Sequence, residues 1–339
     1  MTNNDILFDN IHTKSKQLNL FRENSAVAQQ IHEKFAQGER ILSCPCCGSR
    51  EIKFLVVKYG FPIDLCEHCS HLFTNPFPTT DALNFFYNSK FKDFENKFFI
   101  DSIEARIPIF DYRLKSLRKL LPVGARILDV GGAIGVFVEA NHRRGSPFVI
   151  DVCDLSKSAC YYLSSKHPNL NVINSDILQV DRGGYDCITL WDTLEHLPNP
   201  VALLDKIRSL LKSRESYFCF STPNTRSLEW SVMEHEHVQL LPPGHVNLYN
   251  VHNIKYILGQ AGFRVLSIDT PNPSLDLSYL KRVLLDIEDA EAQKPTVRFC
   301  KELLRFLDNK GLLNHYYEEL KSERRAGNMF VVATVDQAD

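Results

Sequence analysis

The chain lacks a long apolar run near its start, and it lacks a large excess of charge of either sign. Residues 1–10 include two acidic side chains, so we expect neither a signal peptide nor a membrane span, and a cytoplasmic location is the default. The formal net charge of −2 argues against a dominant polyanion-binding surface, so nucleic acid is not an expected partner. With 339 residues, of which 44% are apolar, the chain is long enough for one large domain and a smaller module.

The chain also lacks the Gly-x-Gly-x-x-Gly spacing typical of NAD-binding turns. Residues 127–135 read Ile-Leu-Asp-Val-Gly-Gly-Ala-Ile-Gly, with Ala133 where a second spaced glycine would stand. An apolar strand that breaks into small residues lets the backbone approach a ligand closely, and the apolar pattern of residues 136–145 indicates a helix. This segment predicts a nucleotide-type pocket. Because alanine disfavours positive φ, we expect ordinary backbone angles at Ala133.

Acidic side chains follow two further strands. The strand expected at 148–153 ends at Asp154, which is placed to accept hydrogen bonds from ribose hydroxyls in a doubly wound sheet. Residues 187–191 are almost continuously apolar, as in a central strand buried on both faces. Asp192, at the carboxyl end of that strand, is expected to project into the crevice where open α/β sheets bind ligands.

The glycine segment resembles the first motif of class I S-adenosylmethionine (SAM) methyltransferases. Residues 185–200, which contain Leu194-Glu195-His196, resemble a segment of the subgroup that includes the ubiquinone-biosynthesis O-methyltransferases. The resemblance implies SAM as the cofactor, and it implies that Asp176, after a short strand at 171–173, holds the adenine amino group. The cofactor-binding residues that follow are Asp129, Gly131, Gly132, Ala133, Gly135, Asp154, Leu155, Asp176, Ile177 and Trp191.

The expected fold is α/β: a doubly wound, seven-stranded, mainly parallel sheet of the Rossmann-like methyltransferase type. The remaining strands are expected at 216–221, 262–265 and 328–335, with a helical insertion at 274–325 before the last one, where Leu280, Val283, Leu284 and Ile287 recur at helical spacing. The insertion is expected to form a lid or a homodimer surface. We divide the chain into a helical segment (1–40), a zinc ribbon (41–80), a helical linker or lid (81–120) and a SAM-binding domain (121–339).

Two Cys-x-x-Cys pairs, Cys44/Cys47 and Cys66/Cys69, are eighteen positions apart, which fits a zinc ribbon. Four protein ligands would close the coordination shell, so the predicted Zn²⁺ is structural. Disulfides and unconnected redox pairs are the alternatives. Other side chains that could replace a ligand are Cys46, His68 and His71. The other cysteines, Cys153, Cys160, Cys187, Cys219 and Cys300, are expected to be buried small hydrophobes.

The segment after the second pair, 71–78, contains Asn75-Pro76-Phe77-Pro78 and is followed by Phe86-Tyr87. It resembles the start of many bacterial SAM methyltransferases with a zinc ribbon. Members of that group often modify sugars, natural products or other small metabolites. The resemblance therefore implies methyl transfer to a small-molecule or carrier-linked sugar acceptor, and oxygen is the expected methyl-accepting atom.

Removing a proton from an acceptor hydroxyl calls for a base, and histidine suits that task near neutral pH. His245 is the first choice, because the subgroup has a similar Pro-x-x-His segment beside its acceptor pocket, and His196 and Asp192 are the other predicted catalytic residues. Either histidine could instead only fix a loop. In some relatives the positions of Asp192, Glu195 and His196 are thought to bind a divalent cation. We expect His235 and His237 to lie on an extended, solvated loop, where they share one side and Glu234 and Glu236 face the other, so that the four do not form a metal site.

Two other functions remain open from the sequence. Some ribosomal-RNA methyltransferases also begin with a four-ligand zinc module, so RNA is an alternative acceptor. A non-catalytic SAM-fold module whose ribbon binds a protein partner is the third possibility, and the alanine at position 133 is the feature in its favour.

Overall fold

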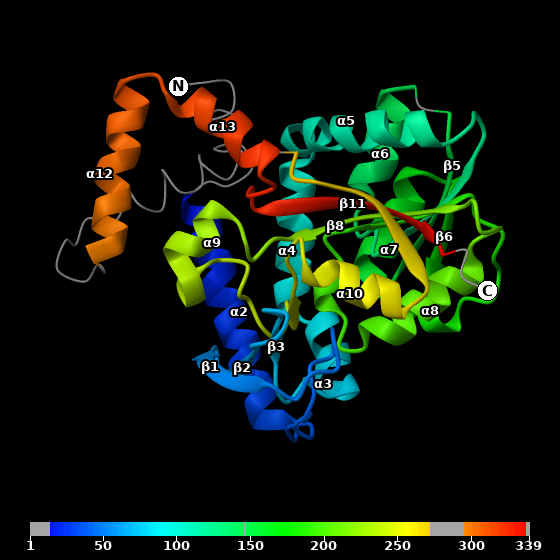
Figure 1. Ribbon diagram of the computed structural model, residues 1–339. Coiled ribbons are helices and arrows are strands. Elements are labelled where there is room, and N and C mark those ends of the chain that lie inside the picture. The colour runs from blue at the N-terminus through cyan, green and yellow to red at the C-terminus, as the bar shows by residue number, and fades with distance from the viewer. Residues whose placement is uncertain (1–13, 146, 272–294, 337–339) are drawn as a thin grey trace.

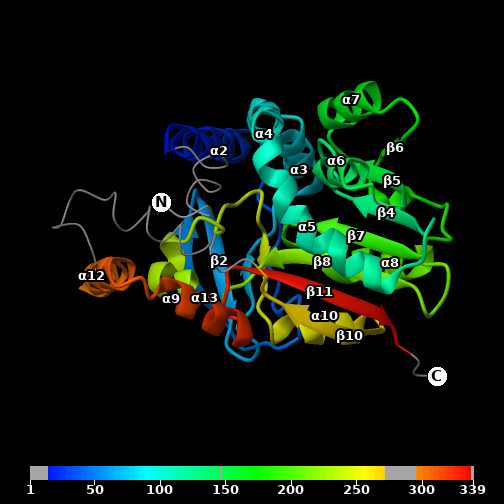
Figure 2. The ribbon, with the colours of Figure 1, turned by 90° about the horizontal axis from the view of Figure 1, so that it is seen from above.

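The computed structural model describes residues 14–145, 147–271 and 295–336. Its larger sheet has seven strands in the order β10-β11-β8-β7-β4-β5-β6 (Figures 1 and 2). Neighbouring strands are parallel except at β11, which is antiparallel to both β8 and β10. The strand bounds are Arg126–Val130 (β4), Val149–Asp154 (β5), Asn171–Asn174 (β6), Cys187–Trp191 (β7), Tyr217–Pro223 (β8), Phe263–Asp269 (β10) and Asn328–Val335 (β11). The predicted doubly wound, mainly parallel fold is confirmed.

Helices cover both faces of this sheet, and the central strand β7 shows why. Cys187 and Trp191 pack into one apolar cluster with α5 (Ile103–Leu120), α6 (Val136–Arg143) and α7 (Lys157–Lys166). Ile188 and Leu190 pack into the other cluster, with α8 (Pro200–Leu210) and α10 (Asn253–Gln260). Because alternate side chains point to opposite faces, a strand buried on both sides is apolar throughout.

The smaller sheet lies beside the two cysteine pairs: Cys44 and Cys47 precede its first strand, Cys66 ends its second strand, and Cys69 lies in the turn before its third. Its order is β1 (Ile52–Lys58), β2 (Phe61–Cys66), β3 (Leu72–Thr74) and β9 (Asn247–Leu248), and every pairing is antiparallel. The first three strands come from the ribbon segment, and the fourth comes from the loop between β8 and β10. The smaller sheet is therefore completed by a segment from the far half of the chain.

Helices from the first third of the chain connect the two sheets. They are α2 (Lys14–Lys34), α3 (Thr80–Tyr87) and α4 (Lys90–Asp101), and α5 follows directly. Apolar side chains of α2, α3 and α4 share a cluster with Phe61 of β2. Figure 2 shows α4 between α2 and α5, and α5 packs on one face of the larger sheet. Residues of α2, α4 and α5 line a cavity together with residues at the carboxyl ends of the parallel strands.

Residues 272–294 of the expected insertion, including Leu280, Val283, Leu284 and Ile287, lie outside the described residues. The described part forms α12 (Pro295–Asn309) and α13 (Leu313–Ser322), which extend beyond the larger sheet in Figure 1. Leu304, Leu307 and Leu320 pack against the short helix α9 (Leu228–Met233). A lid or homodimer role for the insertion stays a prediction. Among the described residues, no helix combines the length and the apolar character needed to cross a membrane.

Candidate active site

A cavity of about 460 Å³ opens at the carboxyl ends of β4, β5 and β7. Residues from β4, β5, β7, α4, α5 and the loop before β9 all line it. Of the predicted cofactor and catalytic residues, every one but Gly135 contributes to the lining: Asp129, Gly131, Gly132, Ala133, Asp154, Leu155, Asp176, Ile177, Trp191, Asp192, His196 and His245. The structure thus brings together residues from positions 129 to 245 of the chain.

The glycine turn is tight because its neighbours leave no room for side chains. A Cβ on Gly131, where φ is +72°, would lie 2.5 Å from Oγ1 of Thr193, and a Cβ on Gly132 would lie 2.6 Å from Cγ1 of Val152. Gly135 does not line the cavity. It precedes α6 at a φ of +78°, and a Cβ there would lie 2.3 Å from Leu163. Gly135 therefore shapes the turn and the packing of α6 behind it.

The expectation of ordinary backbone angles at Ala133 was wrong. Its φ is +45°, in the left-handed region that alanine rarely adopts. In this conformation the backbone N–H of Ala133 donates to Oδ2 of Asp154 at 2.8 Å. The hydrogen bond to a buried carboxylate compensates for the strain of the left-handed backbone.

We call the glycine turn and the carboxyl ends of β5 and β6 the floor of the cavity, and Asp154 lies in this floor. Its other oxygen, Oδ1, accepts from the backbone N–H of Ser156 at 2.7 Å. Burial raises the pKa of this carboxyl, while the two backbone donors act to lower it. Each carboxylate oxygen can accept a second hydrogen bond, and the side chain lines the cavity. The carboxylate is thus anchored on one side and open to a ligand with adjacent hydroxyls on the other.

Two buried polar atoms beside the glycine turn have no hydrogen-bond partner among the described residues: Oδ2 of Asp129 and Nε1 of Trp191. The other oxygen of Asp129 accepts from Thr189 Oγ1 at 2.8 Å, and burial raises the pKa of this carboxyl to about 7. Buried polar groups in folded proteins are normally paired. Since both residues line the cavity, these atoms fit a ligand that has its own donors and acceptors.

The end of β6 supplies the far side of the floor. Asp176 caps a short 3₁₀ helix, η1 (Ile177–Gln179), and its Oδ1 accepts from the N–H of Leu178 at 3.0 Å. Ile177 is buried, and with Leu155 it gives this side of the cavity an apolar surface. An apolar slot beside one carboxylate suits a flat heterocycle with an amino group.

Asp192 is held by three side chains and is open to the cavity on its remaining side. Its φ is +52°, and its carboxylate accepts from Arg113 Nη2 (3.0 Å), Ser221 Oγ (3.0 Å) and Asn328 Nδ2 (2.6 Å). Burial acts to raise its pKa, but the Arg113 guanidinium and these donors prevail and the pKa is lowered. A carboxylate kept ionised by three donors is a poor proton acceptor. The geometry favours an electrostatic role for Asp192 over that of a base, and its assignment as catalytic stays a prediction.

The two predicted catalytic histidines, His196 and His245, lie next to each other and form a second side of the cavity, which we call its wall. Their ring centroids are 4.7 Å apart, at an interplanar angle of 81°. Nδ1 of His196 lies 2.9 Å from the Gly244 carbonyl, and Nδ1 of His245 lies 2.7 Å from the Gln239 carbonyl. Because a carbonyl only accepts, both Nδ1 atoms carry protons, which leaves each Nε2 with a lone pair. Burial lowers the pKa of both imidazoles, so they are neutral near pH 7.

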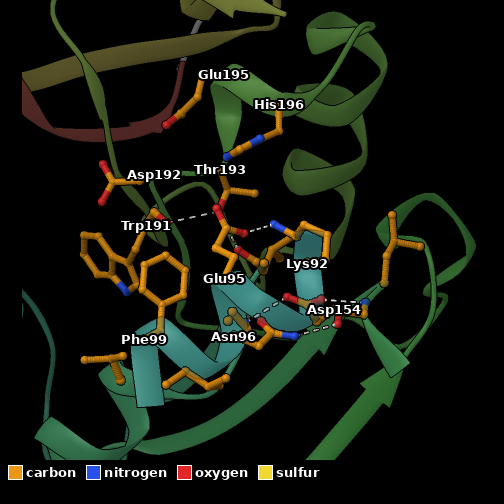
Figure 3. A pocket seen from close by; sticks show the side chains of 18 of the residues that line it. Lys92, Glu95, Asn96, Phe99, Asp154, Trp191, Asp192, Thr193, Glu195 and His196 are labelled. Atoms are coloured by element: carbon orange, nitrogen blue, oxygen red, sulfur yellow. Dashed lines mark hydrogen bonds and ion pairs between the residues drawn. The ribbon is translucent and has the colours of Figure 1, made fainter. Parts of the chain in front are cut away.

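Glu195 directly precedes His196 in η2 (Leu194–His196), and Figure 3 shows both side chains. Its Oε2 accepts from Thr222 Oγ1 at 2.9 Å, and its buried Oε1 has no partner among the described residues. Burial raises the pKa of this carboxyl, and Asp192 adds to the effect. One ligand atom each from Glu195, His196 and His245 lie within 4.8 Å of one another. This cluster differs from the set Asp192, Glu195 and His196 considered from sequence, because Arg113 and its neighbours hold Asp192.

Sequence reasoning missed the side chains that α4 and α5 contribute. Lys92 and Glu95 of α4 form an ion pair that Figure 3 places between Asp154 and His196. Arg106 of α5 is partly buried, with its guanidinium carbon 4.2 Å from the centre of the Phe99 ring, and Nε donates to Ser102 Oγ at 2.8 Å. Its terminal nitrogens have no hydrogen-bond partner within the described segments. The charges alternate along helices with no recognisable motif, so only the tertiary arrangement identifies them.

The structure also differs from the expectation for His235 and His237. Residues Glu234–Glu236 form a 3₁₀ helix, η3, in place of the extended segment expected. His237 is buried, with its ring 5.0 Å from that of Trp230. Contact with an aromatic ring, which the local pattern does not reveal, keeps this histidine in the core.

The four predicted zinc ligands converge, with all sulfur atoms within 4.8 Å of one another. Sγ of Cys44 is 3.7 Å from Sγ of Cys69, and Sγ of Cys47 is 3.6 Å from Sγ of Cys66. A disulfide needs about 2.05 Å, whereas tetrahedral Zn²⁺ with bonds of about 2.3 Å separates sulfurs by about 3.8 Å. The geometry is compatible with the zinc ribbon. The possible substitutes point elsewhere: Cys46 Sγ donates to the Asn253 carbonyl, His71 bonds Asn247, and His68 is exposed.

Of the other cysteines, Cys153, Cys160, Cys187 and Cys219 are buried, as expected. Cys300 is only partly buried. It lies on α12 at the margin of the small cluster with α9, where one side of the helix remains exposed. The expectation of full burial was therefore wrong for Cys300.

A family model described as a methyltransferase domain matches residues 105–268. Ubiquinone biosynthesis O-methyltransferase of Acinetobacter baumannii (strain AYE) is 29% identical over 131 residues, 36% of this chain and 54% of that protein. The enzyme of the same name from Xanthomonas axonopodis pv. citri (strain 306) is 33% identical over 135 residues, 37% of this chain and 56% of that protein. The chain thus spans about half the length of these curated relatives.

Among solved structures, a SAM-dependent methyltransferase from Archaeoglobus fulgidus aligns with a TM-score of 0.46 at 19% identity, over 73% of this chain and all of that one (100%). The described chain thus combines a seven-stranded, mainly parallel sheet with a segment, residues 105–268, that is similar to a methyltransferase domain.

Proposed function

We propose that this protein transfers the methyl group of SAM to an oxygen atom of a small-molecule acceptor, such as a carrier-linked sugar. The observation that carries the proposal is a single cavity that joins the Asp154 floor to the His196–His245 pair. A floor built for an adenosyl group and a wall built for proton removal are the two parts that methylation of a hydroxyl requires.

The residues present fit SAM. Asp154 would accept from the ribose hydroxyls, Asp176 would accept from the adenine amino group, and Leu155 and Ile177 would flank the base. Arg106 offers a fork of donors suited to a carboxylate, and Oδ2 of Asp129 offers an acceptor for an ammonium group. Bound SAM would supply a methyl group already activated by the sulfonium, so the protein has to align the acceptor and take up its proton.

His245 is the proposed base. Its Nδ1 proton is held by the Gln239 carbonyl, so the Nε2 lone pair can receive the hydroxyl proton. His196, held in the same way by Gly244, would orient the acceptor or share that proton.

A second possibility at the same wall is a divalent cation held by Glu195, His196 and His245. The unpaired, buried Oε1 of Glu195 favours it. A cation would lower the pKa of a bound hydroxyl and replace the histidine base. Dialysis against a chelator, followed by return of either Zn²⁺ or Mg²⁺ and Mn²⁺, separates the two: methyl transfer that needs only Zn²⁺, at one ion per chain, leaves histidine as the base.

We also propose that the four thiolates hold one structural Zn²⁺. Metal analysis of the purified protein tests this, with about one zinc per chain expected. An RNA acceptor is disfavoured by the ribbon segment itself, where Arg50, Lys53 and Lys58 are balanced by Glu51, Asp64 and Glu67.

Calorimetric titration with S-adenosylhomocysteine tests the cofactor site. Asp154→Ala should weaken binding by at least roughly 100-fold, because it removes charge-assisted hydrogen bonds to a buried ligand. Asp181→Ala is the matched control, since the Asp181 side chain is 98% exposed. Equal affinity of wild type and Asp154→Ala would remove the assignment. Transfer of labelled methyl to a panel of nucleotide-linked sugars and phenols, compared between wild type and His245→Asn, tests the acceptor side.

A further inference from the structure

The ribbon and the acceptor wall share one segment of chain. His245 is followed directly by residues that pair with the ribbon. Leu248 pairs with Leu72, Asn247 pairs with Phe73, and the N–H of Thr74 donates to the Val246 carbonyl at 2.9 Å. The fourth strand of the ribbon sheet is therefore the continuation of the loop that carries the proposed base.

The same segment is bonded on its other side to η2. The N–H of Val246 donates to the Glu195 carbonyl at 2.9 Å, and Nδ2 of Asn247 donates to the Leu197 carbonyl at 2.7 Å. These bonds hold the residues on both sides of His196. Residues 244–248 are thus clamped between the ribbon and the turn that carries the second histidine.

A buried hydrogen-bond chain runs through this clamp. Nε2 of His71 lies 2.9 Å from Oδ1 of Asn247, and both side chains are fully buried. The amide oxygen only accepts, so His71 is the donor, and the amide nitrogen passes the chain on to Leu197. His71 stands two residues after Cys69, whose carbonyl accepts from Asn253 Nδ2 at 3.3 Å. One end of this hydrogen-bond series therefore stands two residues from a cysteine of the cluster, and the other end lies beside His196.

The cofactor floor is held by different bonds. Asp154 is fixed by Ala133 and Ser156, and the N–H of Gly131 donates to the Cys153 carbonyl at 2.8 Å. These partners all belong to the larger sheet and its turns. A change in the ribbon can therefore reach the histidine wall while the floor keeps its geometry.

We propose that His71 and Asn247 are positioning residues, through which the folded ribbon fixes His196 and His245 for the acceptor without contributing to SAM binding. The proposal rests on the proposed function, which supplies the roles of the two halves. The ribbon is then a part of the acceptor site.

The test compares Asn247→Leu, which has similar size but no amide, with His71→Gln, whose amide nitrogen can replace Nε2 as a donor. His68→Gln is the control, because His68 is an exposed histidine of the same cysteine turn. Three properties are measured for each: zinc content, the dissociation constant of S-adenosylhomocysteine, and the ring ¹⁵N shifts that report the tautomers of His196 and His245.

For Asn247→Leu we expect unchanged zinc content and an S-adenosylhomocysteine affinity within about threefold of wild type. We also expect loss of the fixed Nδ1–H tautomer at His196, His245 or both. The methyl-transfer kcat should fall roughly 10- to 100-fold, as for a small misplacement of a reacting group. His71→Gln should recover most of the tautomer signal and the rate. Wild-type tautomer signals in Asn247→Leu would overturn the proposal. A loss of S-adenosylhomocysteine affinity as large as the loss of methyl-transfer kcat would also overturn it.

Should Asn247→Leu fail to fold, His71→Leu and chelation of the wild-type metal give the same comparison. Either change must alter the tautomers of His196 and His245 and leave S-adenosylhomocysteine binding unchanged, or the proposal fails. The proposed function fails separately: a wild-type protein that does not bind S-adenosylhomocysteine would remove SAM chemistry, whereas the tautomer response would still report the coupling between ribbon and histidines.

Discussion

The floor and the wall of the cavity are built by opposite means. The floor consists of strand ends and a glycine turn, where short side chains are tied to backbone N–H groups, as Asp154 is to Ala133 and Ser156. The wall consists of His196 and His245, whose rings are held by carbonyls of a loop that the ribbon clamps. A floor fixed by neighbouring backbone tolerates little variation, whereas a wall assembled from distant segments can change its ligand without disturbing the floor.

Gly131→Ala should break the floor with the largest effect. The new Cβ would meet Thr193 at 2.5 Å in a left-handed backbone. We expect a loss of about 2–5 kcal/mol in the free energy of unfolding, and a loss of at least about tenfold in S-adenosylhomocysteine affinity. Gly124→Ala is the control, since its φ of +78° imposes the same strain with nothing within 4 Å. Similar affinities for the two variants would show that the floor is not packed against a ligand.

Asp129→Asn sharpens the electrostatic side of the floor. Burial raises the folded-state pKa of Asp129 to about 7. The folded state therefore holds a proton that the unfolded state releases near pH 4, and the wild-type protein loses stability as the pH rises toward 7. Between about pH 5 and about pH 8, wild type should lose on the order of 3 kcal/mol relative to Asp129→Asn.

Urea unfolding at both pH values measures this difference. Asp186→Asn is the control, because hydrogen bonds and Lys212 outweigh burial and lower the Asp186 pKa, so this carboxylate stays ionised throughout that range. Parallel stability curves for wild type and Asp129→Asn would contradict the raised pKa.

Arg113→Met tests how strongly the Arg113 guanidinium holds the Asp192 carboxylate, which lies between the floor and the wall. Arg113 is 8% exposed and Asp192 is 43% exposed at the cavity, so we expect a stability loss of about 1–3 kcal/mol, less than for a fully buried pair. A double-mutant cycle with Asp192→Asn isolates the pair, and Arg118→Met, on the exposed side of the same helix, is the control. A coupling near zero would mean that Ser221 and Asn328 alone hold the carboxylate.

Ala133→Gly should have the smallest effect. Glycine relieves the left-handed strain but gains entropy in the unfolded chain, so the net change is about 1 kcal/mol or less, in the stabilising direction. Ala105→Gly in helix α5 should instead cost about 1 kcal/mol. Thermal unfolding compares the two. A clear loss of stability in Ala133→Gly would show that the alanine methyl group contributes packing that outweighs the strain.

The sequence predicted the floor because its information is local. A strand, a turn and an acidic residue follow one another along the chain, and Gly131, Asp154 and Asp176 fall where that order places them. The four clustered cysteines followed from a similar short pattern, and the mainly parallel sheet followed from the strand segments together with the family resemblance. Arg106, Lys92 and Glu95 escaped prediction, because single charges on a helix have no periodicity that distinguishes a cavity from solvent. The left-handed Ala133 escaped because its partner is twenty-one positions away.

The hairpin of β10 and β11 closes directly, since Asp269 pairs with Phe330 at the point where the chain leaves the sheet. The stretch from 270 to 327 therefore begins and ends at neighbouring points, and the entropy of closing such an excursion depends only weakly on its length. A connecting segment of another length between β10 and β11 would therefore leave the hydrogen bonding of the sheet unchanged. Since α12 and α13 pack on α9, which precedes the loop that carries His245, a different segment here would change the surroundings of that loop and leave the sheet as it is.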